Sequence, residues 1–254
     1  MGVDYKVSQL YETAIHEVVR GQKQWKSILK LIGQIYRYEF DNILMVYMQR
    51  PNATLIADFD TWKKVGRYVK RGSKGIAIFP SRALEPEIRH VFDISDTGGM
   101  SRNLTWELNA DNMAAYAAYL KKEVGEPEKK LNDKEKKESV KKIIKSFTKD
   151  RIGVIMDSEF AGEIKELANL AGTKRFLVDD KTQEVTAEGL LKKSIEYAVF
   201  TRCGLDISPE KQDFSSITAF SSEEEIYRLG SLVSDISCII LRNIAKELKQ
   251  LERS

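Results

Sequence analysis

The apolar residues between Glu223 and Glu252 constrain the fold of this chain more than any other feature of its sequence. They recur at spacings of three, one and four, which is typical of a long amphipathic helix. The stripe consists of Ile226, Leu229, Leu232, Val233, Ile236, Ile239, Ile240, Ile244, Leu248 and Leu251. Because the final segment "KELKQLERS" carries neither a cap nor a stop signal, we expect the helix or the natural chain to continue past Ser254.

Helical spacing also dominates the N-terminal part of the chain. Apolar residues three and four apart predict helices over residues 5–19 and 25–36. A third helix is predicted over residues 40–49, and it ends before Pro51 because the residue that precedes a proline is pushed out of the helical region.

The spacing changes after Trp62, where short segments rich in β-branched and aromatic residues begin. The segments "RYVK", "GIAIF" and "EIRHVFDIS" predict a small antiparallel sheet. The turn "KRGSKG", residues 70–75, is expected to join the first two strands as a hairpin, with Gly72 and Gly75 supplying positive φ. Just before the sheet, Asp60 is expected to cap one helical turn that Gly66 ends.

The rest of the chain again has mainly helical spacing. Helices are predicted over residues 110–124, 158–170 and 187–204, and strands over 151–156 and 175–178. Asp157 is expected to cap the helix that follows it.

These patterns predict an α+β fold, in which a helical N-terminal part packs on a small antiparallel sheet and is followed by a mostly helical second domain. Residues 124–139 are highly charged and contain Gly125 and Pro127, as a linker would. The predicted division is therefore a domain of residues 1–123, a linker of residues 124–139, and a domain of unknown role over residues 140–254.

No set of residues with a catalytic or metal-binding arrangement was found in the sequence. "HEVVR" at His16 lacks the second histidine of a zinc-protease helix. Cys203 and Cys238 have no second pair, so they fit neither a zinc site nor a disulfide framework and are expected to be reduced. Asp157 lacks the spacing of a metal-dependent nuclease. We therefore expect no enzyme activity, no cofactor and no metal.

The sequence also lacks signals for a membrane or for export. It contains no run of eighteen apolar residues, and "MGVDYKVSQLYETAIHEV" has no apolar signal-peptide core. We therefore expect a cytoplasmic protein without a membrane partner.

The charge of the chain is unevenly distributed. The formal net charge is only +3, yet six cations and no carboxylate lie between Trp62 and Lys74. Tyrosines and a tryptophan are interleaved with these cations, as in proteins that bind single strands by neutralising phosphates and stacking on bases. The alternative is a solvated edge hairpin whose lysines discourage aggregation, with Trp62 and the tyrosines in the core.

The run from "YRYEF" to "GIAIFP" resembles the N-terminal single-strand-DNA-binding domain of ArdC-type antirestriction proteins, which also heads plasmid primases and large polyvalent proteins of mobile elements. The family pattern is a tyrosine and an asparagine, Gln-x-Pro, an alanine-threonine step, a tryptophan, and Gly-x-x-Val-x-x-Gly-x-x-Gly-Ile. In this sequence the pattern falls on Tyr38, Asn42, Gln49, Pro51, Ala53, Thr54, Trp62, Gly66, Val69, Gly72, Gly75 and Ile76. The resemblance covers residues 20–100.

The second half is similar, more loosely, to the region behind this domain in long helicase-methyltransferase proteins of conjugative elements. The similar segments are "LLKKSIEYAVFTRCGLD" and "LVSDISCIILRNIAKEL". ArdC-type proteins also carry a zinc-peptidase-like domain with His-Glu-x-x-His, which this sequence lacks. That activity is therefore not expected here.

The resemblance implies a non-catalytic, single-stranded-DNA-binding module of a mobile genetic element, serving antirestriction, DNA protection or recruitment during transfer. The candidate nucleic-acid-binding residues are Arg37, Tyr38, Asn42, Gln49, Arg50, Trp62, Lys63, Lys64, Arg67, Tyr68, Lys70, Arg71 and Lys74. For Asn42 and Gln49, a structural role that ties helix to sheet is left open. The alternative functions are a protein inhibitor of a host defence nuclease and a structural docking region of a larger helicase.

Overall fold

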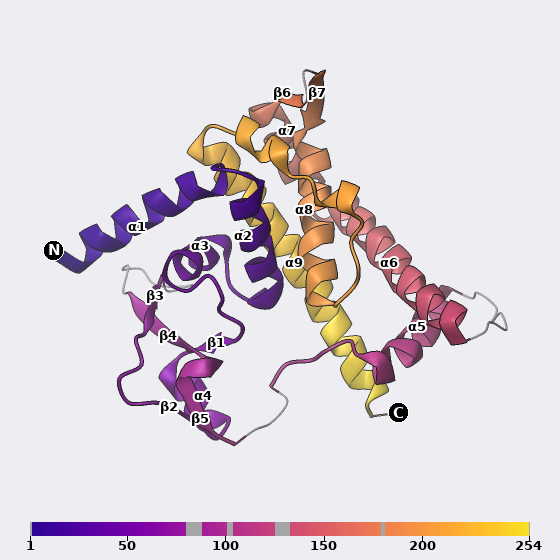
Figure 1. Cartoon of the computed structure of the whole chain (residues 1–254), viewed down its shortest axis with the longest axis horizontal. Coiled ribbons are helices and arrows are strands. Elements are labelled where there is room, and N and C mark those ends of the chain that lie inside the picture. The colour runs from indigo at the N-terminus through magenta and orange to yellow at the C-terminus, as the bar shows by residue number, and fades with distance from the viewer. Residues whose placement is uncertain (1, 80–87, 101–103, 125–132, 179–180, 254) are drawn as a thin grey trace.

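The computed structural model describes residues 2–79, 88–100, 104–124, 133–178 and 181–253 (Figure 1). The described helices are α1 (Gly2–Val18), α2 (Gln22–Gln34), α3 (Phe40–Gln49), α4 (Phe59–Lys64), α5 (Ala110–Val124), α6 (Asp133–Ser158), α7 (Ala161–Ala171), α8 (Ala187–Arg202) and α9 (Glu223–Leu251). The described strands are β1 (Ile56–Ala57), β2 (Arg67–Val69), β3 (Ile76–Ile78), β4 (Arg89–Asp93), β5 (Thr97–Gly99), β6 (Thr173–Val178) and β7 (Lys181–Thr186). The predicted α+β class is confirmed.

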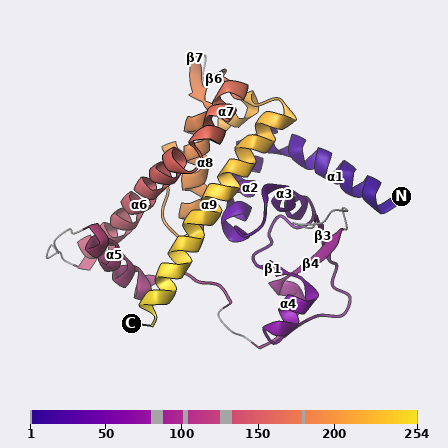
Figure 2. The ribbon, with the colours of Figure 1, turned by 180° about the vertical axis from the view of Figure 1, so that it is seen from behind.

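The long helix α9 is the common packing surface of the helical body. It contacts α1, α2, α3, α5, α6, α7 and α8, and both views show it running the length of the body (Figures 1 and 2). Ser222 and Glu225 form a capping box that fixes its first turn. Its predicted apolar stripe is largely buried, as shown by Leu229, Ile236 and Ile244.

Helices from both halves of the chain share one hydrophobic core. Helices α2 and α8 approach closely at Gly33, where an added Cβ would lie 2.5 Å from the carbonyl oxygen of Ala198. Nearby, the buried Trp25 indole donates a hydrogen bond of 3.0 Å to Oγ of Ser194. The division of the chain into domains of residues 1–123 and 140–254 stays a prediction. Of the predicted linker, residues 125–132 lie outside the described residues, and α6 begins at Asp133.

The sheet region lies against α3 and consists of two small antiparallel sheets (Figure 1). The first has the strand order β1-β4-β3, in which Ile76 lies opposite Val91. The second pairs β2 with β5, and Tyr68 lies opposite Gly98. The predicted hairpin between residues 67–69 and 76–78 is therefore wrong. The backbone N–H of Lys70 donates to the carbonyl of Asp96, so residues 70–75 cross from one sheet to the other.

Two capping predictions and one strand prediction are also wrong. Asp58, rather than Asp60, caps α4 by accepting a bond of 2.7 Å from the N–H of Thr61. Asp157 lies in the last turn of α6, and the N-cap position of α7 is Phe160.

Residues 151–156 are helical within α6. Ile144, Thr148, Ile152 and Ile155 are buried at spacings of four and three, a helical period that a six-residue segment is too short to reveal. The strand predicted at 175–178 is confirmed as part of β6. Within the described part of the chain, no helix is both long and apolar enough to cross a membrane.

A glycine on α9 makes room for an aromatic ring from α3. A Cβ on Gly230 would lie only 2.1–2.4 Å from ring atoms of Phe40, whose side chain is 2% exposed. We expect Gly230→Ala to lower the free energy of unfolding by about 1–3 kcal/mol, because the ring must shift in a packed core. Urea denaturation measures the change.

The matched control is Gly153→Ala on α6, where an added Cβ meets no atom within 4 Å. This change is expected to raise the free energy of unfolding by about 0.5–1 kcal/mol, as alanine does in a helix interior. If Gly230→Ala is as stable as Gly153→Ala, the close packing of α3 on α9 is wrong.

Candidate nucleic-acid interface

The basic segment, residues 63–75, runs from the end of α4 through β2 to the start of β3. Its connection, residues 70–75, is fixed on the turn of residues 94–96. Nζ of Lys70 donates 3.0 Å to the carbonyl of Ser95, and Oγ of Ser73 donates 3.2 Å to the carbonyl of Asp96. Because these bonds add to the Lys70–Asp96 backbone bond, the connection is held in place before any ligand arrives.

Besides Lys70, two more of the predicted cations are engaged in hydrogen bonds within the protein. The Arg50 guanidinium binds the carboxylate of Asp96 and donates 3.0 Å to Oγ of Ser95. Arg67 donates 2.8 Å to Oγ1 of Thr97 and 2.8 Å to the carbonyl of Met100. These side chains secure the 94–100 segment.

Four other cations remain uncommitted. Lys63, Lys64, Arg71 and Lys74 are exposed, and their side chains make no hydrogen bond or ion pair within the described residues. Arg37 is also exposed, with its guanidinium 5.8 Å from the centre of the Tyr36 ring. These four cations of the basic segment are therefore the ones free to meet a negatively charged ligand.

The three predicted stacking residues lie in different environments. Trp62 is 2% exposed, and its Nε1 donates 2.9 Å to the carbonyl of Phe92. Tyr38 donates 3.0 Å from its hydroxyl to the carbonyl of Ile56, and burial followed by the charge of Asp58 raises its pKa to about 12. In contrast, Tyr68 is 62% exposed.

Gly98 supports the exposed ring of Tyr68 from the neighbouring strand. A Cβ on Gly98 would lie 2.7 Å from both Cζ and the hydroxyl oxygen of Tyr68, so the ring lies across this glycine. Sequence reasoning missed this role of Gly98. The role could have been found from the position of Gly98 opposite Tyr68 in a β2–β5 pair, but the expected hairpin paired β2 with β3 instead.

Asn42 and Gln49 bind the free edge of β3. Asn42, which is 2% exposed, donates 3.0 Å to the carbonyl of Phe79 and accepts 2.7 Å from its N–H. Gln49 donates 2.8 Å to the carbonyl of Ala77 and accepts 2.9 Å from its N–H. Both amides thus tie helix to sheet, the structural role left open from the sequence.

Asp93 anchors the start of the 94–96 turn. Its buried carboxylate accepts bonds of 2.7 Å from the N–H of Thr54 and 2.6 Å from the hydroxyl of Ser95. Burial alone would raise the pKa of Asp93, but the hydrogen bonds from Ser95, Thr54 and Leu55 hold it below its ordinary value. Asp93 therefore stays ionised as a structural centre of the turn.

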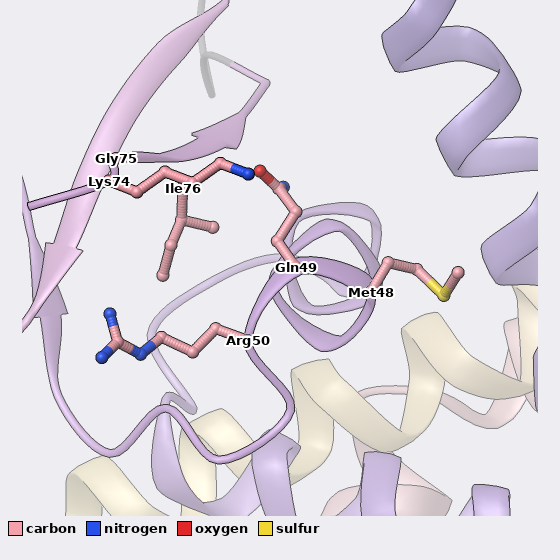
Figure 3. A pocket seen from close by; sticks show the side chains of 6 residues that line it. All are labelled: Met48, Gln49, Arg50, Lys74, Gly75 and Ile76. Carbon is pink, nitrogen blue, oxygen red and sulfur yellow. The ribbon is translucent and has the colours of Figure 1, made fainter.

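A pocket lies between the end of α3 and the start of β3 (Figure 3). Its volume is about 420 Å³, and its lining residues are Met48, Gln49, Arg50, Lys74, Gly75 and Ile76. Two predicted cations from separate elements, Arg50 and Lys74, therefore line one concave site. Within the described ranges, no three His, Cys, Asp or Glu side chains gather as metal ligands.

The family model described as the N-terminal domain of anti-restriction factor ArdC matches residues 7–149, more than half of the 254 residues. The matched range contains most of α1, all of α2 to α5, both sheets of the basic region and the pocket. No curated protein and no solved structure matches the chain.

Removal of the Asn42 amide is expected to leave the N–H and the carbonyl of Phe79 without their partner. We expect Asn42→Ala to lower the free energy of unfolding by roughly 2–5 kcal/mol, since two polar groups lose hydrogen bonds at a buried site. Gln49→Ala, at an exposed position where water replaces the amide, is expected to cost about 1 kcal/mol or less. Urea denaturation gives both values, and unchanged hydrogen exchange at Phe79 in Asn42→Ala would contradict this pairing.

Proposed function

Since the chain belongs to the family of the N-terminal domain of anti-restriction factor ArdC, we propose that it is a non-catalytic module that binds single-stranded DNA. Its role is antirestriction, DNA protection or recruitment during the transfer of a mobile genetic element, and it acts in the cytoplasm. The observation that carries the proposal is the position of Tyr68, an exposed aromatic ring within the basic segment.

Electrostatics supports phosphates as the partner of the basic segment. Lys63, Lys64, Arg71 and Lys74 are exposed and uncommitted, and the segment between Trp62 and Lys74 contains no carboxylate. The carboxylate of Asp96 is already bound to Arg50. A strand that follows these cations can neutralise several phosphates at once.

The stacking geometry favours a single strand over a duplex. The faces of the bases in a duplex are covered by their neighbours, whereas an unpaired base can stack on an exposed ring. Tyr68 offers such a ring, and the rigid strand pair β2–β5 holds it in place. In this proposal Trp62 and Tyr38 support the fold and do not stack on bases, because their polar atoms donate to backbone carbonyls.

The four uncommitted cations set the expected salt dependence. We expect the logarithm of the binding constant for a single-stranded oligonucleotide to fall with the logarithm of salt concentration with a slope of about −3, since each neutralised phosphate contributes about −0.7. In Lys63→Gln/Lys64→Gln/Arg71→Gln/Lys74→Gln the slope is expected to approach zero. Fluorescence anisotropy over a salt series measures both.

The control for this experiment carries four charge changes on exposed residues elsewhere: Lys23→Gln, Lys30→Gln, Lys165→Gln and Lys192→Gln. It should keep the slope of the natural sequence. The inhibitor function would be favoured instead if the natural sequence did not bind DNA at low salt but captured a host defence nuclease in a salt-insensitive way.

The Tyr68 ring gives a second prediction that does not depend on charge. We expect Tyr68→Ala to weaken single-strand binding by about 1–3 kcal/mol and Tyr68→Phe to bind like the natural sequence, because stacking needs the ring but not its hydroxyl. Gly98→Ala adds one carbon under the ring and is expected to weaken binding while the protein stays folded. Anisotropy and circular dichroism test both expectations, and equal binding by Tyr68→Ala would remove the ring from the site.

A further inference from the structure

The pocket between α3 and β3 offers a ligand positively charged donors from two sides. Arg50 stands at the C-cap of α3, and Lys74 lies in the connection before β3. Figure 3 shows Ile76 between these two side chains, with the amine of Lys74 extended toward the end of Gln49. The volume of about 420 Å³ lies within the range of small-molecule sites in proteins.

Arg50 is held in position for a ligand. Its guanidinium binds Asp96 and Ser95, and these two bonds use two of the five N–H donors that an arginine carries. The side chain is one-third exposed, at 33%, so part of it faces solvent. A fixed guanidinium with remaining donors suits a phosphate oxygen.

The amide of Gln49 cannot serve as a donor for a ligand. Its Nε2 already donates to the carbonyls of Met45 and Ala77, and these two bonds use both of its N–H groups. The side-chain donors left in the pocket therefore belong to cations. Such a pocket selects for negative charge rather than for a neutral sugar or base.

We propose that this pocket binds the phosphate group of one nucleotide between Arg50 and Lys74. The inference rests on the proposed function, since a bound strand that reaches Lys74 brings such a phosphate to the pocket. A free nucleotide carries the same group. Asp96 opposes the ligand, because its carboxylate neutralises Arg50 and repels a phosphate nearby.

Two substitutions are expected to change the affinity in opposite directions. Lys74→Gln removes one charged donor and should weaken thymidine 5′-monophosphate binding roughly tenfold or more. Asp96→Asn releases Arg50 and should strengthen binding roughly three- to tenfold. The backbone carbonyl of Asp96, which accepts from Lys70 and Ser73, is present in both proteins.

Matched controls are available on α7, which lies away from β3 in both ribbon views (Figures 1 and 2). Lys165→Gln and Glu163→Gln make the same charge changes at exposed positions there. Both controls are expected to bind thymidine 5′-monophosphate like the natural sequence. An effect of net charge alone would instead move them together with the two pocket variants.

The experiment is an NMR titration of protein with ¹³C-methyl-labelled methionines, with the Met48 signal identified through Met48→Leu. Thymidine 5′-monophosphate and, more weakly, inorganic phosphate are expected to shift the Met48 signal, whereas thymidine is not. An equal response to thymidine, or no response to any of the three, would overturn the phosphate site.

A single-stranded oligonucleotide separates this inference from the proposed function. Met100, which is 53% exposed beside β5, reports on the region of Tyr68. If the oligonucleotide shifts Met100 but not Met48, and Lys74→Gln binds it like the natural sequence, the pocket inference falls and DNA binding stands. If the oligonucleotide does not bind, the proposed function falls, and the mononucleotide titration alone decides the pocket.

Discussion

The pairing of two side-chain amides on α3 with the edge of β3 is the interaction on which the basic region depends. A strand edge presents N–H and carbonyl groups that need partners. Asn42 and Gln49 provide these partners at Phe79 and Ala77, and they stand two helical turns apart on one face of α3. The helix thus takes the place of another strand and fixes where β3 starts, immediately after the last residue of the basic segment.

The basic segment combines fixed and free cations. Arg50, Arg67 and Lys70 each donate hydrogen bonds to the 94–100 segment, which fixes their positions on it. Lys63, Lys64, Arg71 and Lys74 extend from the protein surface into solvent. The sequence alone identifies the basic segment as a run of cations without a carboxylate. The sequence did not separate the two groups, because a fixed cation differs from a free one only in having hydrogen-bond partners 25 to 46 residues further along the chain.

Patterns of local origin were predicted well, and those that depend on distant partners were not. The apolar spacing placed α3, α8 and α9 because the period is contained within each helix. The strands were found as segments, but β2 was paired with β3 because a glycine-containing turn stood between them. The actual partner of β2 follows β4 in the chain, and no local signal specifies it. The same limit applies to the contact of Gly98 with the Tyr68 ring, because these two residues face each other only when β2 pairs with β5.

The central position of α9 has a consequence for the way the chain folds during synthesis. Two contacts of α9 are made with residues almost two hundred positions earlier. Ser234 donates to the carbonyl of Tyr38, in the turn before α3, and Gly230 packs against the ring of Phe40, at the start of α3. The ribosome therefore exposes the apolar faces of α2 and α3 long before α9 is made. During that interval the early helices need transient protection, so translation speed and chaperone supply are expected to govern the yield of folded protein.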